Sequence, residues 1–209
     1  MRLLLTGDSI TDCGRARPLG EGPWGLGTGY VRDLYALLGA RRPELAAHVL
    51  NTGVSGDTVR DLSERCPTDV RALQPDVLGV LIGINDVWRQ FDAPGEPEAG
   101  VPLDEYEARL DAVLFATRPT VRSMILMTPF FIEPNRDEPM RARMDAYGAV
   151  ARAIAARRDA VLVDLQAVFD RLCEHRHPMA IASDRVHPGP IGHMAIATAV
   201  FDALADVPC

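Results

Sequence analysis

Residues 77–86 read VLGVLIGIND: six almost continuously apolar residues, followed at once by a glycine and then by two polar residues after Ile84. A strand with one face in water alternates apolar and polar residues, whereas an unbroken apolar run indicates burial on both faces. Residues 123–127, SMILM, have the same character. Both stretches therefore indicate the middle of a parallel sheet that helices cover on either side.

Short apolar runs alternate with stretches of helical period along the rest of the chain. The runs predict strands over residues 2–6, 48–51, 77–82, 121–127 and 160–164. The periodic stretches predict helices over 30–38, 58–66, 103–116, 140–157, 165–173 and 189–204, with loops at 15–28, 90–102 and 131–138. Within 103–116 the apolar residues lie three or four positions apart and share one face: Leu103, Tyr106, Leu110, Val113 and Leu114. This alternation is typical of the α/β class, and the right-handed crossover rule favours a doubly wound, flavodoxin-like sheet of five parallel strands.

Composition limits what the motifs can mean. At 209 residues and 47% hydrophobic content, the chain suits one domain, residues 1–209. The net charge of −7, with arginine and acidic residues interspersed, argues against a nucleic-acid partner. No apolar run has the length of a membrane helix or of a signal peptide core, which predicts a cytoplasmic protein without a membrane partner. Four cysteines, Cys13, Cys66, Cys173 and Cys209, lie too far apart in sequence to indicate a disulfide framework or a zinc knuckle.

Polar motifs follow three of the predicted strands. They are GDS at 7–9, NTGVSGDT at 51–58 and GIND at 83–86. Because parallel strands end at one edge of the sheet, these motifs are expected to lie close together. A fourth motif, DRVHP at 184–188, precedes the last predicted helix, where the chain can return to the same edge.

Acyl transfer by a serine enzyme needs a nucleophile, an imidazole base, an orienting carboxylate and donors for the oxyanion. Ser9 is the candidate nucleophile, His187 the base and Asp184 the carboxylate. Gly56 and Asn85 are the candidate oxyanion donors, together with the Ser9 N–H. Each motif taken alone has a plainer interpretation as a helix cap, a turn or a strand exit. Their joint occurrence, in this order and at one edge, favours catalysis.

Other polar and aromatic residues leave alternatives open. Trp88 and Arg89 are candidates for binding a sugar ring, although Trp88 could instead anchor its loop to the core. A zinc site from His175, His177 and His187 remains an alternative, but the spacing is a poor zinc signature. We expect no metal and no other cofactor, and a structural role for the thiol of Cys13.

The blocks GDSI, SGDT, GIND and DRVH resemble those of the SGNH hydrolases, also called the GDSL family. The resemblance implies a three-layer α/β/α sandwich. It assigns the roles given above to Ser9, Gly56, Asn85, Asp184 and His187. The stretches GDSITDCGRARP, IGINDVWRQFD and ILMTPF are similar to bacterial intracellular acetylxylan esterases of this family. That similarity implies removal of acetyl groups from xylo-oligosaccharides, and a homo-oligomer.

One departure concerns Ser183, which stands where the nearest relatives are expected to carry a bulky aromatic residue, so the pocket shape and sugar preference stay open. Two further functions also stay open. A lysophospholipase or thioesterase would use the same catalytic residues with a longer apolar groove. A catalytically silent carbohydrate-binding protein would keep the fold alone. A phosphate-binding module is disfavoured, because the chain has no P-loop motif.

Overall fold

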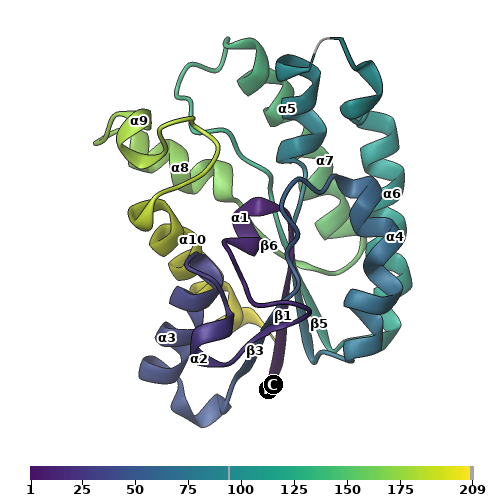
Figure 1. Ribbon diagram of the computed structural model, residues 1–209, viewed down its shortest axis with the longest axis vertical. Helices are drawn as coiled ribbons and strands as arrows, with labels where there is room; N and C mark the ends of the chain where they lie inside the picture. The colour runs from purple at the N-terminus through teal and green to yellow at the C-terminus, as the bar shows by residue number, and fades with distance from the viewer. Residues whose placement is uncertain (94, 208–209) are drawn as a thin grey trace.

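The strands form one sheet in the computed structural model, which describes residues 1–93 and 95–207 (Figure 1). In the order β2-β3-β1-β4-β5-β6, the strands are β2 (Gly20–Glu21), β3 (His48–Asn51), β1 (Arg2–Gly7), β4 (Val77–Leu81), β5 (Ser123–Met127) and β6 (Val161–Val163). The neighbours from β3 to β6 all pair in parallel. Taken in chain order, these five strands stand 2-1-3-4-5, so the predicted flavodoxin-like order is confirmed.

The strand β2 corrects the predicted count of five. It lies within residues 15–28, which we expected to be a loop, and it pairs antiparallel with β3 through Gly20 opposite Asn51 and Glu21 opposite Leu50. A strand of two residues is too short to show an alternating pattern. It is recognisable as a strand only through its pairing with β3.

Helices cover both faces of the sheet and give the predicted three layers (Figure 1). One face carries α3 (Tyr30–Arg41), α8 (Leu165–Cys173) and α10 (Pro190–Ala203). The other carries α4 (Val59–Asp69), α6 (Leu103–Thr117) and α7 (Pro139–Arg157). Shorter helices are α1 (Ser9–Asp12), α2 (Gly22–Gly25), α5 (Ile84–Asp92) and α9 (Pro178–Ile181).

Helix α5 is the main element that the sequence interpretation missed. We predicted no helix after the strand at 77–82 and a loop at residues 90–102, whereas a helix begins at Ile84 and ends at Asp92. Ile84 and Val87 are buried on its inner face. With Trp88 and Phe91 they form a short helical pattern, so the signal was present but only two turns long.

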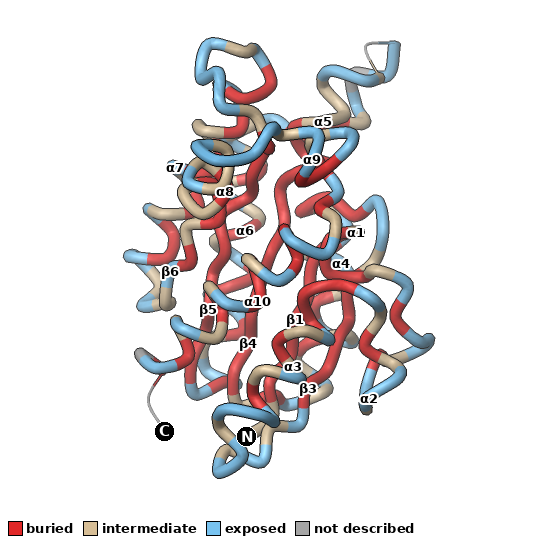
Figure 2. The backbone as a smooth tube through the Cα atoms, turned by 90° about the vertical axis from the view of Figure 1, so that its left-hand side faces the viewer, coloured by how far each residue is buried: buried red, intermediate tan, exposed pale blue. Residues whose placement is uncertain are grey.

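The core lies where the apolar runs predicted it. Every residue of β4 and β5 is buried, and the buried backbone runs through the centre of the molecule in Figure 2. On α6, Tyr106, Leu110, Val113 and Leu114 are buried, as their spacing predicted. The sheet is thus held between two apolar helix layers, and its strand ends have fixed positions.

Leu110→Ala on α6 should lower the free energy of unfolding by about 2–5 kcal/mol, because it leaves a cavity beneath a side chain with no exposed surface. Phe115→Ala on the same helix is the control, since that ring is 64% exposed and its loss should cost less than about 1 kcal/mol. Urea unfolding of both variants measures the difference. Equal losses would contradict the packing described for α6.

Candidate active site

The register of the sheet brings the polar motifs to one edge. The central strand β1 places Gly7 opposite Leu81 of β4 and Leu5 opposite Asn51 of β3. The segments that follow these three strands therefore leave the sheet side by side. Gly7 is required here, because a Cβ at this position would lie 2.0 Å from the carbonyl oxygen of Leu81.

Ser9 begins the short helix α1, but it does not cap that helix. The cap is Asp8, whose Oδ1 accepts a hydrogen bond from the Ile10 N–H at 3.0 Å. The plainer interpretation of Ser9 as a capping residue is therefore wrong. Its hydroxyl lies instead 2.9 Å from Nε2 of His187, although the two residues are 178 positions apart in sequence.

Hydrogen bonds hold the loop that carries His187, both between its two ends and along one side. The Gly189 N–H donates to the carbonyl of Ile181 at 2.8 Å, which closes the loop. The segment after β5 holds its side, since the Ile132 N–H donates to the carbonyl of Arg185 at 2.9 Å. The Arg185 guanidinium pairs with Glu133 at 2.6 Å. These contacts keep the loop over the end of β1.

Asp184 orients the imidazole. Its Oδ2 lies 2.7 Å from Nδ1 of His187, and its Oδ1 accepts the N–H groups of Val186 at 2.9 Å and His187 at 2.8 Å. Partial burial raises the pKa of Asp184, but the hydrogen bonds from His187 and Val186 outweigh it and bring that pKa below its ordinary value. The carboxylate thus favours the tautomer with its proton on Nδ1, which leaves Nε2 free to accept from Ser9.

Three N–H groups are candidates for stabilising an oxyanion. Gly56 has φ +90°, a left-handed conformation that glycine adopts without strain. The Asn85 side chain donates through Nδ2 to the carbonyl of Asp57 at 2.9 Å. Among the described residues the second hydrogen of this amide has no acceptor. Within residues 1–93 and 95–207, the N–H groups of Ser9 and Gly56 have no protein acceptor.

Trp88 lies beside the imidazole. Its ring centroid is 5.7 Å from that of His187, in an edge-on arrangement. The Arg89 guanidinium lies 4.9 Å above the Trp88 ring and pairs with Asp92. Trp88 therefore lies next to His187 and is partly buried, whereas the contacts of Arg89 are with Trp88 and Asp92.

Cys13, His193 and His177 make other contacts. The Cys13 thiol lies 3.4 Å from Nε2 of His193, and burial raises its pKa to about 11, so it is a poor nucleophile. Nδ1 of His193 accepts the N–H of Tyr30. His177 accepts the N–H of Met179 through its own Nδ1. Because His187 binds Ser9 and Asp184, the alternative zinc site that included it is not supported.

Two buried carboxyls escaped the sequence interpretation. Asp8 and Asp86 have no exposed surface, and one oxygen of each, Oδ2, has no hydrogen-bond partner in the part of the chain that the structure describes. Burial raises the pKa of each to about 7, although a backbone N–H bonds the other oxygen. Asp8 directly precedes Ser9, and Asp86 directly follows Asn85. A sequence motif does not show that such a side chain points into the core.

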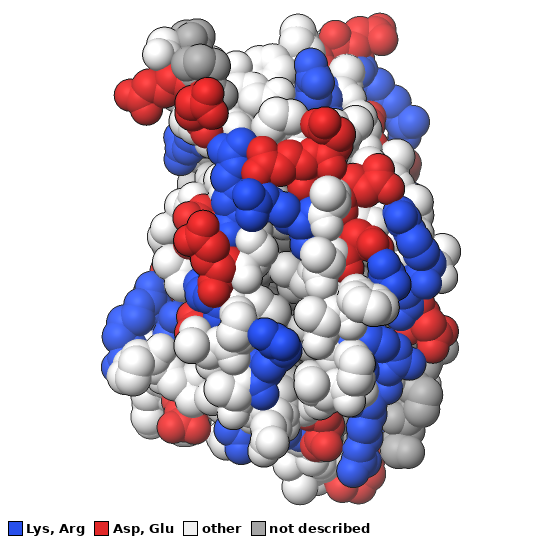
Figure 3. All heavy atoms as spheres, turned by 90° about the vertical axis from the view of Figure 1, so that its right-hand side faces the viewer, with Lys and Arg blue, Asp and Glu red and all other residues white. Residues whose placement is uncertain are grey.

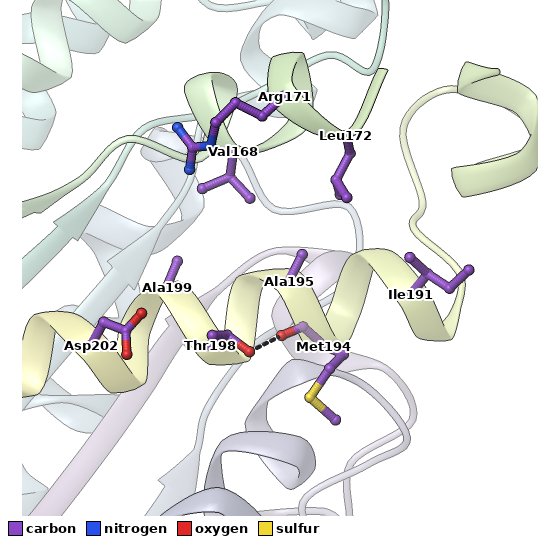
Figure 4. A pocket seen from close by; sticks show the side chains of 9 residues that line it. All are labelled: Val168, Arg171, Leu172, Ile191, Met194, Ala195, Thr198, Ala199 and Asp202. Carbon is purple, nitrogen blue, oxygen red and sulfur yellow. Dashed lines mark hydrogen bonds between the residues drawn. The ribbon is translucent and has the colours of Figure 1, made fainter. Parts of the chain in front are cut away.

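Two cavities differ in how close they lie to the predicted site residues. A groove of about 440 Å³ between α8 and α10 is lined mainly by apolar side chains, but it contains none of the predicted site residues (Figure 4). A second cavity of about 520 Å³ adjoins Asp184 and includes Ser183, Met179 and Glu133 in its lining.

On the face formed by α4 and α6, acidic and basic side chains interleave (Figure 3). None of the described helices is long and apolar enough to cross a membrane.

Comparison with known proteins places this fold and site in a class. Residues 5–195 match the GDSL-like lipase/acylhydrolase family. The chain belongs to this family, as the four blocks predicted.

Two relatives make the comparison more specific. The chain is 53% identical over 199 residues to an acetylxylan esterase of Geobacillus stearothermophilus, covering 95% of this chain and 91% of the relative. A crystal structure of that enzyme superposes with a TM-score of 0.95, at 52% identity and covering 97% of this chain and 93% of the other. An α/β hydrolase from the metagenome of Lake Arreo, Spain, gives a TM-score of 0.95 at 48% identity, covering 100% of this chain and 96% of the other.

Asp86→Asn should change the pH dependence of stability. At pH 4–7 the unfolded chain has released this proton while the folded protein, with a pKa of about 7, still holds it. Stability therefore falls as pH rises through this window. The asparagine side chain cannot release a proton, so the variant does not lose stability in this way. Between pH 5 and pH 7 its free energy of unfolding should therefore rise by about 2 kcal/mol relative to that of the wild type.

Urea unfolding at pH 5, 6, 7 and 8 measures this difference. Asp202→Asn, on the exposed side of α10, is the control for removing a carboxylate at the surface. A constant difference between Asp86→Asn and the wild type would show that Asp86 is ionised in the folded protein across the whole range.

Proposed function

We propose that the protein is a serine esterase that removes acetyl groups from xylo-oligosaccharides or related acetylated sugars through an acetyl-serine intermediate. The observation that carries the proposal is the chain of hydrogen bonds from Ser9 through His187 to Asp184, with spacings of 2.9 Å and 2.7 Å. This is the arrangement in which an imidazole can remove a proton from a serine hydroxyl.

In the first step, the Ser9 Oγ attacks the acetyl carbonyl carbon while Nε2 of His187 takes the hydroxyl proton. The carbonyl electrons move to oxygen, and the N–H groups of Ser9 and Gly56 and the amide of Asn85 stabilise the negative charge. The tetrahedral intermediate collapses with cleavage of the bond to the sugar oxygen, which takes the proton back from His187. Asp184 stabilises the imidazolium between the two transfers.

In the second step, water replaces the sugar. His187 removes a proton from this water, the hydroxide adds to the acetyl carbonyl, and the same donors hold the oxyanion. Collapse breaks the bond to Ser9 Oγ, which regains its proton from the imidazolium, and acetate leaves. The triad thus returns to its starting state.

The substrate class rests on the relatives and on how open the site is. The similar Geobacillus stearothermophilus protein is an acetylxylan esterase, and solved structures of it include alanine variants at a serine, a histidine and an aspartate that are described as catalytic mutants. In this chain the side chains of His187 and Asp184 are 44% and 40% exposed. Trp88, beside His187, offers an aromatic face of the kind on which a sugar ring can stack.

Ser9→Ala should abolish turnover of p-nitrophenyl acetate and of acetylated xylo-oligosaccharides, because no other group supplies the attacking oxygen. Circular dichroism and urea unfolding should match the wild type, since the hydroxyl is not part of the core. Acetate release is the measurement. Full activity of this variant would refute the assignment of Ser9.

A series of p-nitrophenyl esters from acetyl to octanoyl separates this function from a lysophospholipase or thioesterase. We expect kcat/KM to be highest for acetyl and to fall at least about tenfold for octanoyl, as an acetyl-sized site must exclude the added methylenes. A preference for octanoyl would favour the lipid esterase.

Labelling of Ser9 by a fluorophosphonate, compared with Ser9→Ala, tests the silent sugar-binding alternative, which predicts no labelling.

The homo-oligomer that the resemblance implies stays a prediction, as do the cytoplasmic location inferred from the short apolar runs and the absence of a metal or other cofactor.

A further inference from the structure

Arg65, on α4, has a largely buried guanidinium, with the side chain only 14% exposed. Helical side chains lean toward the N-terminus of their helix, and this one extends back to the sheet edge. Its Nε donates to the carboxylate of Asp57 at 2.5 Å, its Nη1 to the carbonyl of Thr52 at 2.8 Å, and its Nη2 to the carbonyl of Gly7 at 2.9 Å. Nη1 also lies 3.2 Å from Oγ1 of Thr6.

These acceptors belong to the segments that carry the proposed oxyanion donors. Gly7 ends β1 directly before Asp8 and Ser9. Thr52 and Asp57 stand at the two ends of the loop that contains Gly56. The backbone carbonyl of Asp57 in turn accepts the Asn85 amide. One guanidinium thus contacts both ends of the Gly56 loop and the strand end that leads to the nucleophile.

The other hydrogen bonds that hold this loop lie on either side of Gly56; the Arg15 Nε, for example, donates to the carbonyl of Gly53 at 2.7 Å. A Cβ on Gly56 would meet no atom within 4 Å, so nothing packs against its Cα on that side. On one flank, Asp12 accepts the Ser55 N–H at 3.0 Å and the Ser55 hydroxyl at 2.8 Å. The Val54 N–H donates to the carbonyl of Gly7, the same oxygen that Arg65 binds. At the far end, the Asp57 N–H donates to the carbonyl of Val54 and the Asp57 carbonyl accepts the Asn85 amide. Among these contacts, Arg65 is the one that ties Asp57 to the end of β1.

We propose that Arg65 is a positioning residue for the esterase reaction, whose guanidinium sets the spacing between the N–H groups of Ser9 and Gly56 and the amide of Asn85. The inference rests on the function proposed above and deepens it. Arg65 touches none of the three donors, so it acts only through Gly7, Thr52 and Asp57.

The planar fork of arginine suits this task. Its N–H groups diverge in one plane toward acceptors on different segments, whereas lysine carries its donors on a single nitrogen. Arg65→Lys keeps the positive charge beside Asp57 but cannot reach Asp57, Thr52 and Gly7 together. The loop is then free to shift while the hydrogen bonds from Ser9 to Asp184 stay in place.

Arg60→Lys is the matched control, because Arg60 stands on the same helix and makes similar bonds that face away from the loop. Its Nε and Nη2 bind Glu105 at 2.8 Å and 2.6 Å, and its Nη1 donates to the carbonyl of Glu98 at 2.7 Å. These contacts join α4 to α6 and to the segment before it. The control therefore loses an arginine fork without disturbing the proposed donors.

With p-nitrophenyl acetate, we expect Arg65→Lys to lower kcat about 10- to 100-fold with KM changed less than about threefold. Removing an oxyanion donor outright costs about 10²–10³ in kcat, and misplacing donors costs part of that. Arg60→Lys should keep kcat within about twofold, even where urea unfolding shows a loss of stability. The acid limb of the pH–kcat profile should keep its midpoint in Arg65→Lys, since His187 and Asp184 are untouched.

A double-mutant cycle with Asn85→Ala tests the route of the effect. If Arg65 acts by placing the oxyanion donors, the loss in the double variant is smaller than the product of the two single losses. Phenylboronic acid, whose adduct with serine places an oxygen among these donors, should bind Arg65→Lys about tenfold more weakly than it binds Arg60→Lys.

Equal kcat in Arg65→Lys and Arg60→Lys would overturn the positioning role, as would fully multiplicative losses in the cycle. Should Arg65→Lys fail to fold, Asp57→Asn takes its place. It keeps the carbonyl that binds Asn85 and weakens the partner of Arg65, so kcat should fall about 3- to 10-fold, and an unchanged kcat would refute the proposal. The same assay includes Ser9→Ala. Turnover that persists in Ser9→Ala would refute the proposed function. Turnover that requires Ser9 but is unchanged in Arg65→Lys would refute only this inference.

Discussion

The parallel pairing of β1 with β3 and β4 fixes the position of everything that follows the three strands. Backbone hydrogen bonds set Leu5 opposite Asn51 and Gly7 opposite Leu81, so a slip in register would separate Ser9 from the Gly56 loop and from Asn85. Buried side chains on both faces hold that register. The fourth component, the loop with Asp184 and His187, arrives from the far end of the chain. It is placed by its closure between Ile181 and Gly189 and by its contacts with the segment after β5.

The sequence predicted the frame of this arrangement well, because burial on both faces leaves a strong local pattern. The unbroken runs near Leu78 and Ile125 predicted strands that are buried throughout, and the spacing of Tyr106 and Leu110 predicted the inner face of α6. The order of the motifs along the chain then implied which strand ends would meet. Elements of only two residues or two turns, β2 and α5, were missed because such lengths show almost no periodicity.

For the candidate site, the sequence indicated residues with suitable chemistry but not their geometry. Ser9, Asp184 and His187 could be chosen because their chemistry is specific, whereas Asp8 and Arg65 look like ordinary surface residues in a sequence. Whether a charged side chain points inward depends on the direction of its Cα–Cβ bond in the folded chain, and Asp8, in a short turn-like motif, belongs to no periodic pattern that would show that direction. The contacts of Arg65 with Thr52 and Gly7 cross 13 and 58 positions of sequence. They therefore exist only once the sheet has formed.

The buried pair Asp8 and Asp86 has a calorimetric consequence. Each holds a proton in the folded protein up to about pH 7, against an ordinary pKa of 3.8, so unfolding at pH 6 expels these protons into the solvent. The surrounding buffer must absorb them. The heat recorded for unfolding will therefore contain the protonation enthalpy of the buffer, and phosphate and imidazole solutions of equal pH will report different values for the same molecular event.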